Sequence, residues 1–141
     1  IENKDNIINI HFMMQKEFVD RIISNCGNKT YGRLSVLVQL FFDCEKFIDI
    51  EPMDFYPSPK VYSSFIKLVP KEKILLKKNE IEEFLVFTKS IFNKRRKKIK
   101  NSLDIKYFYL YDNMDKRAEQ LTINEMIKLF RDIKKDDGQF I

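Results

Sequence analysis

The chain has 141 residues, of which 44% are hydrophobic, enough for one compact domain or for part of one with a small second domain. The single histidine, His11, and the two cysteines, Cys26 and Cys44, form no CxxC motif or Cys/His cluster. This composition argues against a metal site and against a Ser-His-Asp triad. No run approaches the roughly 20 apolar residues of a membrane span, so we expect a cytoplasmic protein without a membrane partner.

The net charge of +5 is concentrated in one segment. Residues 71–106 contain 12 basic and 5 acidic residues, whereas residues 1–70 and residues 107–141 each carry a net charge of −1. Such an asymmetry favours a polyanionic partner, and nucleic acid is the commonest one. The alternative is a solvated lysine-rich surface that binds nothing.

The N-terminal part of the chain predicts a strand followed by two helices. Residues 7–14 are a short apolar run with β-branched side chains, which is typical of a buried strand. Residues 15–24 carry apolar side chains at helical spacing, and Gly27 is placed to cap the end of that helix. Residues 34–42 are nearly all apolar and predict a second, buried helix. A strand followed by a helix is the beginning of an α/β repeat.

Two alternating segments then bracket a proline-rich loop. Residues 45–50 and residues 61–69 alternate polar and apolar side chains, as strands do. Between them, Pro57 and Pro59 fix the backbone and remove two hydrogen-bond donors. The sequence therefore predicts a pair of strands joined by a rigid loop that presents functional side chains.

The rest of the chain predicts a second domain. Residues 70–79 are charged and have no clear period, so we place a domain boundary at this segment. This assigns residues 1–70 to an α/β domain and residues 71–141 to a small all-α domain.

Two helices are predicted in the second domain. An apolar stripe from Ile81 to Phe92 predicts a helix that runs directly into the basic residues 93–101. Residues 122–125 match a capping box at the start of a last helix, with Leu121 and Met126 in the positions of a hydrophobic staple.

Four blocks of sequence carry a family resemblance. They are Met14-Gln15-Lys16-Glu17 followed by Arg21, residues 31–39 (YGRLSVLVQ), residues 55–63 (FYPSPKVYS), and residues 95–103 (RRKKIKNSL) followed by residues 117–121 (RAEQL). In this order they resemble the KsgA and Erm family of rRNA adenine-N6 methyltransferases. The second and fourth blocks resemble the KsgA branch more than the Erm resistance enzymes.

The resemblance implies a fold and an activity. The fold would be α/β, the C-terminal part of a Rossmann-like class I methyltransferase sheet followed by a small all-α domain. The whole enzyme would use S-adenosylmethionine to dimethylate two adjacent adenosines near the 3′ end of small-subunit rRNA, as a monomer docked on the assembling small ribosomal subunit. The family's Gly-rich donor loop and Asn-Leu-Pro-Tyr motif do not occur in the chain, which begins at Ile1 without an initiator Met. We therefore expect a segment of a longer enzyme that lacks the donor site and is inactive by itself.

Two other functions fit the same residues. One is an Erm-type methyltransferase that acts on large-subunit rRNA. The other is a non-catalytic module that binds rRNA or assists ribosome assembly.

The resemblance also implies site residues. Phe55 would stack on the target adenine, and the alternative is a phenylalanine that fills the core beneath the loop. The predicted contacts to RNA are Arg33, Lys60, Arg95, Arg96, Lys97, Lys98 and Lys100. Alternatively, Arg33 and Lys60 bind an internal carboxylate, and Arg95 holds its helix against the sheet domain. Arg117 and Glu119 are interpreted as a structural pair or a contact at a helix end. No cofactor-binding or metal-binding residue is predicted in this chain.

Overall fold

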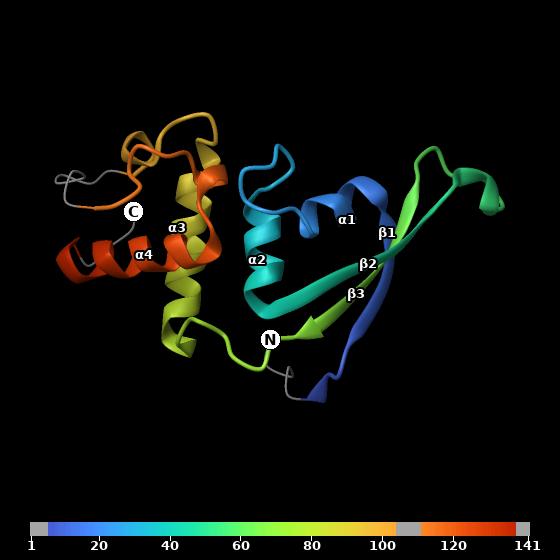
Figure 1. Cartoon of the computed structure of the whole chain (residues 1–141), viewed down its shortest axis with the longest axis horizontal. Helices are drawn as coiled ribbons and strands as arrows, with labels where there is room; N and C mark the ends of the chain where they lie inside the picture. The colour runs from blue at the N-terminus through green and yellow to red at the C-terminus, as the bar shows by residue number, and fades with distance from the viewer. Residues whose placement is uncertain (1–5, 104–110, 138–141) are drawn as a thin grey trace. The chain divides into compact units, whose positions relative to one another are not determined.

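The computed structural model describes residues 6–103 and 111–137 of the chain. The chain divides into two compact units (Figure 1). The first unit comprises Ile1–Ser24 and Leu34–Ile74, and the second comprises Asn25–Arg33 and Leu75–Ile141. The chain thus enters the second unit twice, first through a short segment between two helices and later through the whole C-terminal part.

The first unit contains a three-stranded antiparallel sheet with helices between its first two strands. Its elements are β1 (Ile10–Gln15), α1 (Lys16–Ile22), α2 (Arg33–Phe41, whose first residue belongs to the second unit), β2 (Phe42–Ile50) and β3 (Ser63–Pro70). The strand order is β1-β3-β2, so the last strand of the sequence lies in the centre and pairs antiparallel with both neighbours. The predicted strands and helices of this part of the chain are found, with ends shifted by a few residues. The expectation that the first strand is buried is wrong, because β1 is an edge strand and most of its side chains are exposed.

The core of the first unit lies on one face of this sheet. Alternate residues of β3, Ile66 and Leu68, are buried against Val19 and Ile22 of α1. The period of two along the strand meets the helical period of α1, and each apolar side chain removed from water contributes roughly 1.5–3 kcal/mol. The sheet is therefore anchored to its helices by the residues whose alternation predicted a strand.

The predicted helix cap at Gly27 is wrong. Helix α1 ends at Ile22, and its C-cap residue Ile23 keeps a right-handed helical conformation while its N–H donates to the carbonyl of Val19 at 3.0 Å. Gly27 does have a positive φ of 87°, the conformation in which glycine avoids a steric penalty. It uses that conformation in the segment that joins the second unit, where its N–H donates to the carbonyl of Glu119 at 2.7 Å.

The described residues of the second unit form two α-helices and short 3-10 turns. Its elements are η3 (Lys78–Glu80), α3 (Ile81–Asn93), η4 (Ile99–Asn101), η6 (Ala118–Gln120) and α4 (Ile123–Asp137). The rings of Phe84, Phe87 and Phe130 are fully buried, with centroids 5.5–6.0 Å apart, and they form the aromatic centre of the unit.

The predicted capping box is confirmed. The N–H of Glu125 donates to the hydroxyl oxygen of Thr122 at 3.2 Å, and the N–H of Thr122 donates to the Glu125 carboxylate at 2.8 Å. These bonds satisfy two backbone donors at the start of α4. Leu121 and Met126, in the staple positions, are both fully buried.

The sequence led us to expect that helix α3 continues into the basic run. This expectation is wrong. The helix ends at Asn93, and Lys94 leaves it with φ −112° and ψ 47°. The N–H of Lys97 closes a turn onto the carbonyl of Lys94 at 2.7 Å. A continued helix would have placed like charges three and four residues apart on one surface, which destabilises a helix. The turn spreads these cations in several directions instead.

Within residues 6–103 and 111–137, no helix is long and apolar enough to cross a lipid bilayer.

Candidate nucleic-acid interface

The first candidate region is the proline loop between β2 and β3. Its opening turn η2 (Pro52–Asp54) is closed by the N–H of Asp54 on the carbonyl of Glu51 at 3.1 Å, and the N–H of Glu51 donates to the Asp54 carboxylate at 3.2 Å. The hydroxyl of Ser58 donates to the carbonyl of Pro52 at 2.7 Å, and the Tyr56–Pro57 peptide is cis. Two prolines and these local bonds hold the loop in one conformation.

This loop carries two adjacent aromatic residues with different exposure. Phe55 is half-buried, and its N–H donates to the carbonyl of Pro52 at 3.3 Å. Tyr56 is fully exposed, and Met53 is 78% exposed. Lys60 is exposed too, and it forms no ion pair with a described residue. The loop thus presents a surface that combines aromatic rings with a cation. The sequence analysis did not consider Tyr56, although it stands between Phe55 and a proline.

A cluster of four charged residues lies where α1 meets the end of β2. The ammonium of Lys16 is 2.8 Å from the carboxylate of Asp20 and 3.1 Å from that of Asp49, and Lys46 pairs with the same two carboxylates at 3.1 Å. The Ser64 hydroxyl donates to Asp49 at 2.5 Å, and this bond together with the two lysines lowers the Asp49 pKa to about 2. With two charges of each sign, the cluster is internally neutral and positions α1 against β2 and β3.

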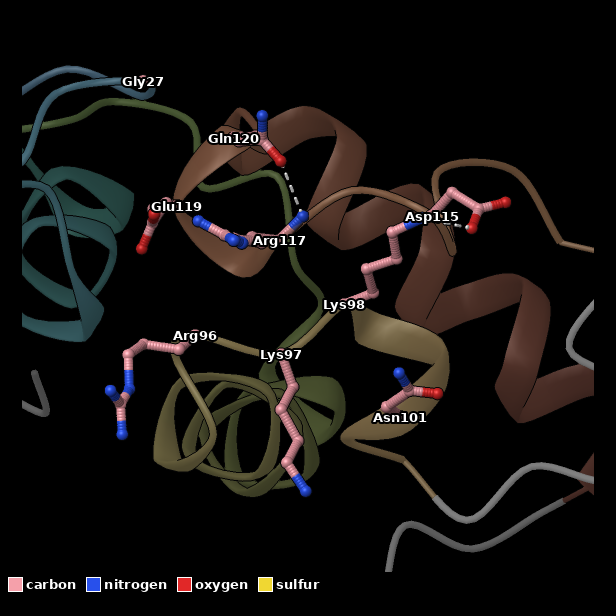
Figure 2. Close-up of a pocket in the computed structure, with 9 residues that line it drawn as sticks. All are labelled: Gly27, Arg96, Lys97, Lys98, Asn101, Asp115, Arg117, Glu119 and Gln120. Atoms are coloured by element: carbon pink, nitrogen blue, oxygen red, sulfur yellow. Dashed lines mark hydrogen bonds and ion pairs between the residues drawn. The ribbon is translucent and has the colours of Figure 1, made fainter.

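The second candidate region is a cavity of about 670 Å³ in the second unit. The residues that line it are Gly27, Arg96, Lys97, Lys98, Asn101, Asp115, Arg117, Glu119 and Gln120 (Figure 2). Four of these side chains are cationic and two are anionic. The lining therefore has an excess of positive charge together with two amide side chains, which suits a phosphate-bearing ligand.

Two strand-like segments form one wall of this cavity. Lys98 and Arg117 face each other in an isolated antiparallel bridge. The N–H of Ile99 donates to the carbonyl of Lys116 at 2.9 Å, and the N–H of Lys100 donates to that of Met114 at 3.1 Å. The basic run is thereby fixed beside residues 114–117 although it is not helical.

The cations differ in how strongly they are engaged. The Asp115 carboxylate accepts Lys98 at 3.1 Å and Lys100 at 2.8 Å, and these two ammonium groups lower its pKa. The side chains of Arg96 and Lys97 are exposed and form no ion pair within the described part of the chain. Figure 2 shows both extending away from the backbone of the basic run. They are therefore accessible to a phosphate, as is Arg117, which is also exposed and without an ion pair among the described residues.

Arg95 is bound internally, unlike its two neighbours in the run. Its Nε donates to Oε2 of Glu119 at 2.8 Å, and its Nη2 donates to the carbonyls of Tyr31, at 3.1 Å, and Lys29. The sequence analysis had paired Glu119 with Arg117, but the partner of Glu119 is Arg95.

Arg33 also points inward. Its Nη2 donates to the carbonyl of Leu85 on α3 at 3.5 Å, and its Nε is buried without a hydrogen-bond partner among the described residues. Its observed contact is a backbone carbonyl and not the internal carboxylate considered from the sequence. Arg33 is partly exposed, and its role toward RNA stays a prediction.

The cavity includes residues that the sequence analysis missed. Asn101 and Gln120 line it, and Gln120 accepts the backbone N–H of Arg117 at 2.8 Å. The side chain of Arg117 forms no ion pair with any residue in the described ranges. The only signal in the sequence was that these residues lie within the fourth resemblance block.

The described part of the chain contains no Gly-rich loop of the kind that holds a methyl donor. A Gly-rich donor loop requires glycines at which a bound group approaches the backbone closely. Gly27 and Gly32, the glycines in the described ranges, are separated in sequence, and a Cβ atom added at either would meet no atom within 4 Å. The described residues also contain no cluster of three or more metal-ligating side chains.

Comparison with known proteins adds a family match. Residues 2–135 match the family model described as ribosomal RNA adenine dimethylase. The ribosomal RNA small subunit methyltransferase A of Wigglesworthia glossinidia brevipalpis is 44% identical over 135 residues, which are 92% of this chain and 51% of that protein. The chain thus spans about half the length of the curated relatives that it matches.

Two solved structures share the fold. A dimethyladenosine transferase from Plasmodium falciparum matches 99% of this chain and 62% of its own, with a TM-score of 0.81 and 23% identity. The 23S rRNA methyltransferase ErmE matches 89% of this chain and 54% of its own, with a TM-score of 0.63 and 19% identity. The expectation of a methyltransferase-like fold is confirmed at this level, with a small antiparallel sheet and helices in the chain itself.

Proposed function

The chain belongs to the ribosomal RNA adenine dimethylase family, and from this premise we propose that the whole protein dimethylates N6 of two adjacent adenosines near the 3′ end of small-subunit rRNA. S-adenosylmethionine is the proposed methyl donor. Support for the small subunit comes from the relative at 44% identity, which is a small-subunit methyltransferase.

The observation that carries the proposal is the position of Phe55 in the proline loop. A base removed from its stack needs a flat apolar surface, and stacking on an aromatic ring contributes about 1–3 kcal/mol per base. The half-buried ring is held by a loop with little freedom, so stacking costs little additional ordering. We assign Phe55 to the target adenine and the exposed Lys60 to the RNA backbone.

Methyl transfer requires mainly that the adenine nitrogen is correctly positioned. When bound, S-adenosylmethionine would supply the methyl group, with its sulfonium becoming a thioether, and the adenine nitrogen would lose a proton. Such a transfer is accelerated by holding the two atoms in line. Phe55 is the residue of this chain that orients the base. The donor site is assigned to other parts of the whole protein, because the Gly-rich loop of the family does not occur in this chain.

The cavity of the second unit is the proposed docking site for rRNA. Arg96 and Lys97 are the principal phosphate contacts, since they have no internal partner among the described residues, and Lys98 and Lys100 are secondary because they share Asp115. Arg117 and the amides of Asn101 and Gln120 complete the lining. Arg95 is assigned to internal support, because two backbone carbonyls and the Glu119 carboxylate occupy three of its donors. Arg33, whose Nη2 donates to the carbonyl of Leu85, is assigned to internal support as well.

The finer description of the fold is also a proposal. We assign the sheet to the C-terminal part of a larger Rossmann-like sheet and the second unit to a small helical domain that docks on the assembling small subunit. Strand β1 lies at the edge of the three-stranded sheet, which is where we place a further strand of the whole protein. The exposed side chains of Phe12 and Met13 on β1 would then be covered by other parts of the whole protein. The whole protein is proposed to act as a cytoplasmic monomer.

The test is methyl transfer from radiolabelled S-adenosylmethionine to unmethylated small ribosomal subunits, with large subunits as the comparison. We expect the whole protein to label the small subunit rRNA at N6 of two adjacent adenosines, and the 141-residue chain alone to label neither subunit. Label on the large subunit would replace the proposal by the Erm-type activity. Label on neither subunit, with RNA binding retained, would favour a non-catalytic module.

A further inference from the structure

Three segments that are far apart in the sequence meet at the side chain of Arg95. They are residues 25–33, the basic run itself and residues 115–120. The Arg95 guanidinium bonds the carboxylate of Glu119 in one segment and the carbonyls of Lys29 and Tyr31 in another. Three of its five N–H donors are thus occupied by groups of the protein. The planar fork of arginine suits this bridging, which a single ammonium group cannot reproduce.

Two further contacts hold the same three segments together. The N–H of Gly27 donates to the carbonyl of Glu119 at 2.7 Å. The backbone of Glu119 thus binds residues 25–33 directly, and its carboxylate is linked to the same segment through Arg95. Tyr31 is 1% exposed and its ring lies 6.4 Å from that of Phe92 in an edge-to-face arrangement. We call the set of Gly27, Tyr31, Arg95 and Glu119 the clasp.

The clasp forms part of the cavity wall. Gly27 and Glu119 line the cavity, whereas Arg95 does not, and Arg96 follows Arg95 directly in the chain. Arg95 thereby fixes where the chain leaves toward Arg96 and Lys97. It also neutralises the carboxylate of Glu119, which would otherwise repel a phosphate in the cavity.

We propose that Arg95 is a positioning residue for RNA docking, and that it acts through the clasp without contacting phosphate. This inference rests on the proposed function, because it concerns how the cavity binds rRNA. In this proposal, Arg95 supports the structure of the site, and its neighbours in the basic run contact the RNA. The sequence alone does not distinguish these two roles, because it shows only five cations within six positions.

A pair of conservative substitutions tests the proposal. Arg95→Lys and Arg96→Lys both keep the positive charge, and binding of the whole protein to a fluorescein-labelled 3′-terminal fragment of small-subunit rRNA is measured from 50 to 200 mM salt, well below the unfolding temperature. We expect Arg95→Lys to weaken binding by roughly three- to tenfold. Arg95→Ala should weaken it by the same factor, because either substitution breaks the same network of hydrogen bonds. Arg96→Lys should stay within about twofold of the original protein, because lysine also binds phosphate as a point charge.

The salt dependence separates the two roles further. A residue that contacts one phosphate reduces the slope of log affinity against log salt by about 0.7–0.9 when it is removed. We expect that reduction for Arg96→Ala and an unchanged slope for Arg95→Ala. If Arg95→Lys binds like the original protein while Arg95→Ala loses slope, Arg95 is a phosphate contact and the proposal fails. If Arg96→Ala is also without effect, the docking function of the cavity itself fails.

Amide hydrogen exchange provides a readout that does not depend on RNA. Both substitutions of Arg95 should raise exchange in the peptide that covers residues 25–33, including the N–H of Gly27, and Arg96→Ala should leave it unchanged. Unchanged exchange in the Arg95 variants would show that the clasp does not hold this segment, and would overturn the proposal even if RNA affinity had fallen.

Discussion

The proline loop and the cavity hold their proposed RNA contacts by different physical means. In the loop, Pro57, Pro59 and a few local hydrogen bonds fix the backbone, and the side chain that matters is an aromatic ring. In the cavity, the backbone of the basic run is irregular, and ion pairs to Asp115 and Glu119 set where the cations lie. The conformation of the loop therefore depends mainly on its prolines, and the arrangement of cations in the cavity depends on ion pairs.

This difference predicts how each region responds to its surroundings. Ion pairs between partly exposed groups weaken as salt rises and as their carboxylates are protonated. Stacking on an aromatic ring changes little with either variable. Base capture by the loop should therefore persist under conditions that abolish docking by the cavity.

The largest expected effect comes from the aromatic core of the second unit. Phe130→Ala removes a fully buried ring that packs at 5.5 Å and 5.8 Å from Phe84 and Phe87, and should lower the free energy of unfolding by about 3–5 kcal/mol. Urea denaturation measures this value, and Phe130→Leu serves as the control that keeps most of the buried apolar volume and should lose less than Phe130→Ala. A loss of less than about 1 kcal/mol for Phe130→Ala would show that the ring cluster is not what supports the second unit.

The next effect concerns the aromatic residues of the loop. Phe55→Ala should reduce kcat/KM for methyl transfer by the loss of about 1–3 kcal/mol of stacking, roughly 5- to 150-fold, at both low and high salt. Tyr56→Ala is the matched control, because this neighbouring ring is fully exposed and is not assigned to the target base. A larger loss for Tyr56→Ala than for Phe55→Ala would move the stacking role to Tyr56.

Local patterns in the sequence were sufficient for the elements that position the loop. The alternation in residues 45–50 and 61–69 predicted the two strands, and Pro57 and Pro59 predicted the irregular connection between them. Both signals act over neighbouring residues, so a single sequence contains them. That β3 lies between β1 and β2 did not follow, because strand order depends on pairing between distant residues.

The cavity was less predictable for the same reason. Composition identified the basic run, but its conformation depends on the bridge between Lys98 and Arg117 and on the bonds from Arg95 to residues 29 and 31. Like charges at helical spacing were the one local sign that α3 would stop at Asn93. The partner of Glu119 was assigned to Arg117, two residues away, and lies 24 residues away at Arg95.

A smaller effect distinguishes cations that contact RNA from cations that are only nearby. Arg96→Ala and Lys97→Ala should each reduce the salt slope of RNA binding by about 0.7–0.9, the value for one lost phosphate contact. Lys94→Ala is the control, because Lys94 is exposed and adjacent but does not line the cavity. The same loss of slope in all three variants would mean that the run binds RNA through its total charge, without a defined site.

The smallest expected effect is a pH dependence in the ion pairs that support each unit. In the second unit, Nε and Nη2 of Arg131 donate to the two oxygens of Glu80 at 3.0 Å and 2.8 Å, and Arg131 lowers the Glu80 pKa from its ordinary 4.5 to about 2. Because the pKa is lower in the folded protein, this stabilisation is complete above pH 4.5 and is lost as the pH falls toward 2. Since Arg131 is partly exposed, the loss should be on the order of 0.5–1 kcal/mol. Glu80→Gln should remove that part of the pH dependence of unfolding, measured by urea denaturation between pH 2 and 7.

In the first unit, the lowered pKa of Asp49 gives the same sign in the same pH range, so Asp49→Asn should remove a separate part of the pH dependence of unfolding. The double variant should then lose both contributions to the pH dependence of the free energy of unfolding. If it loses no more than either single variant, the two units do not titrate independently, and the difference between the loop and the cavity does not extend to acid stability.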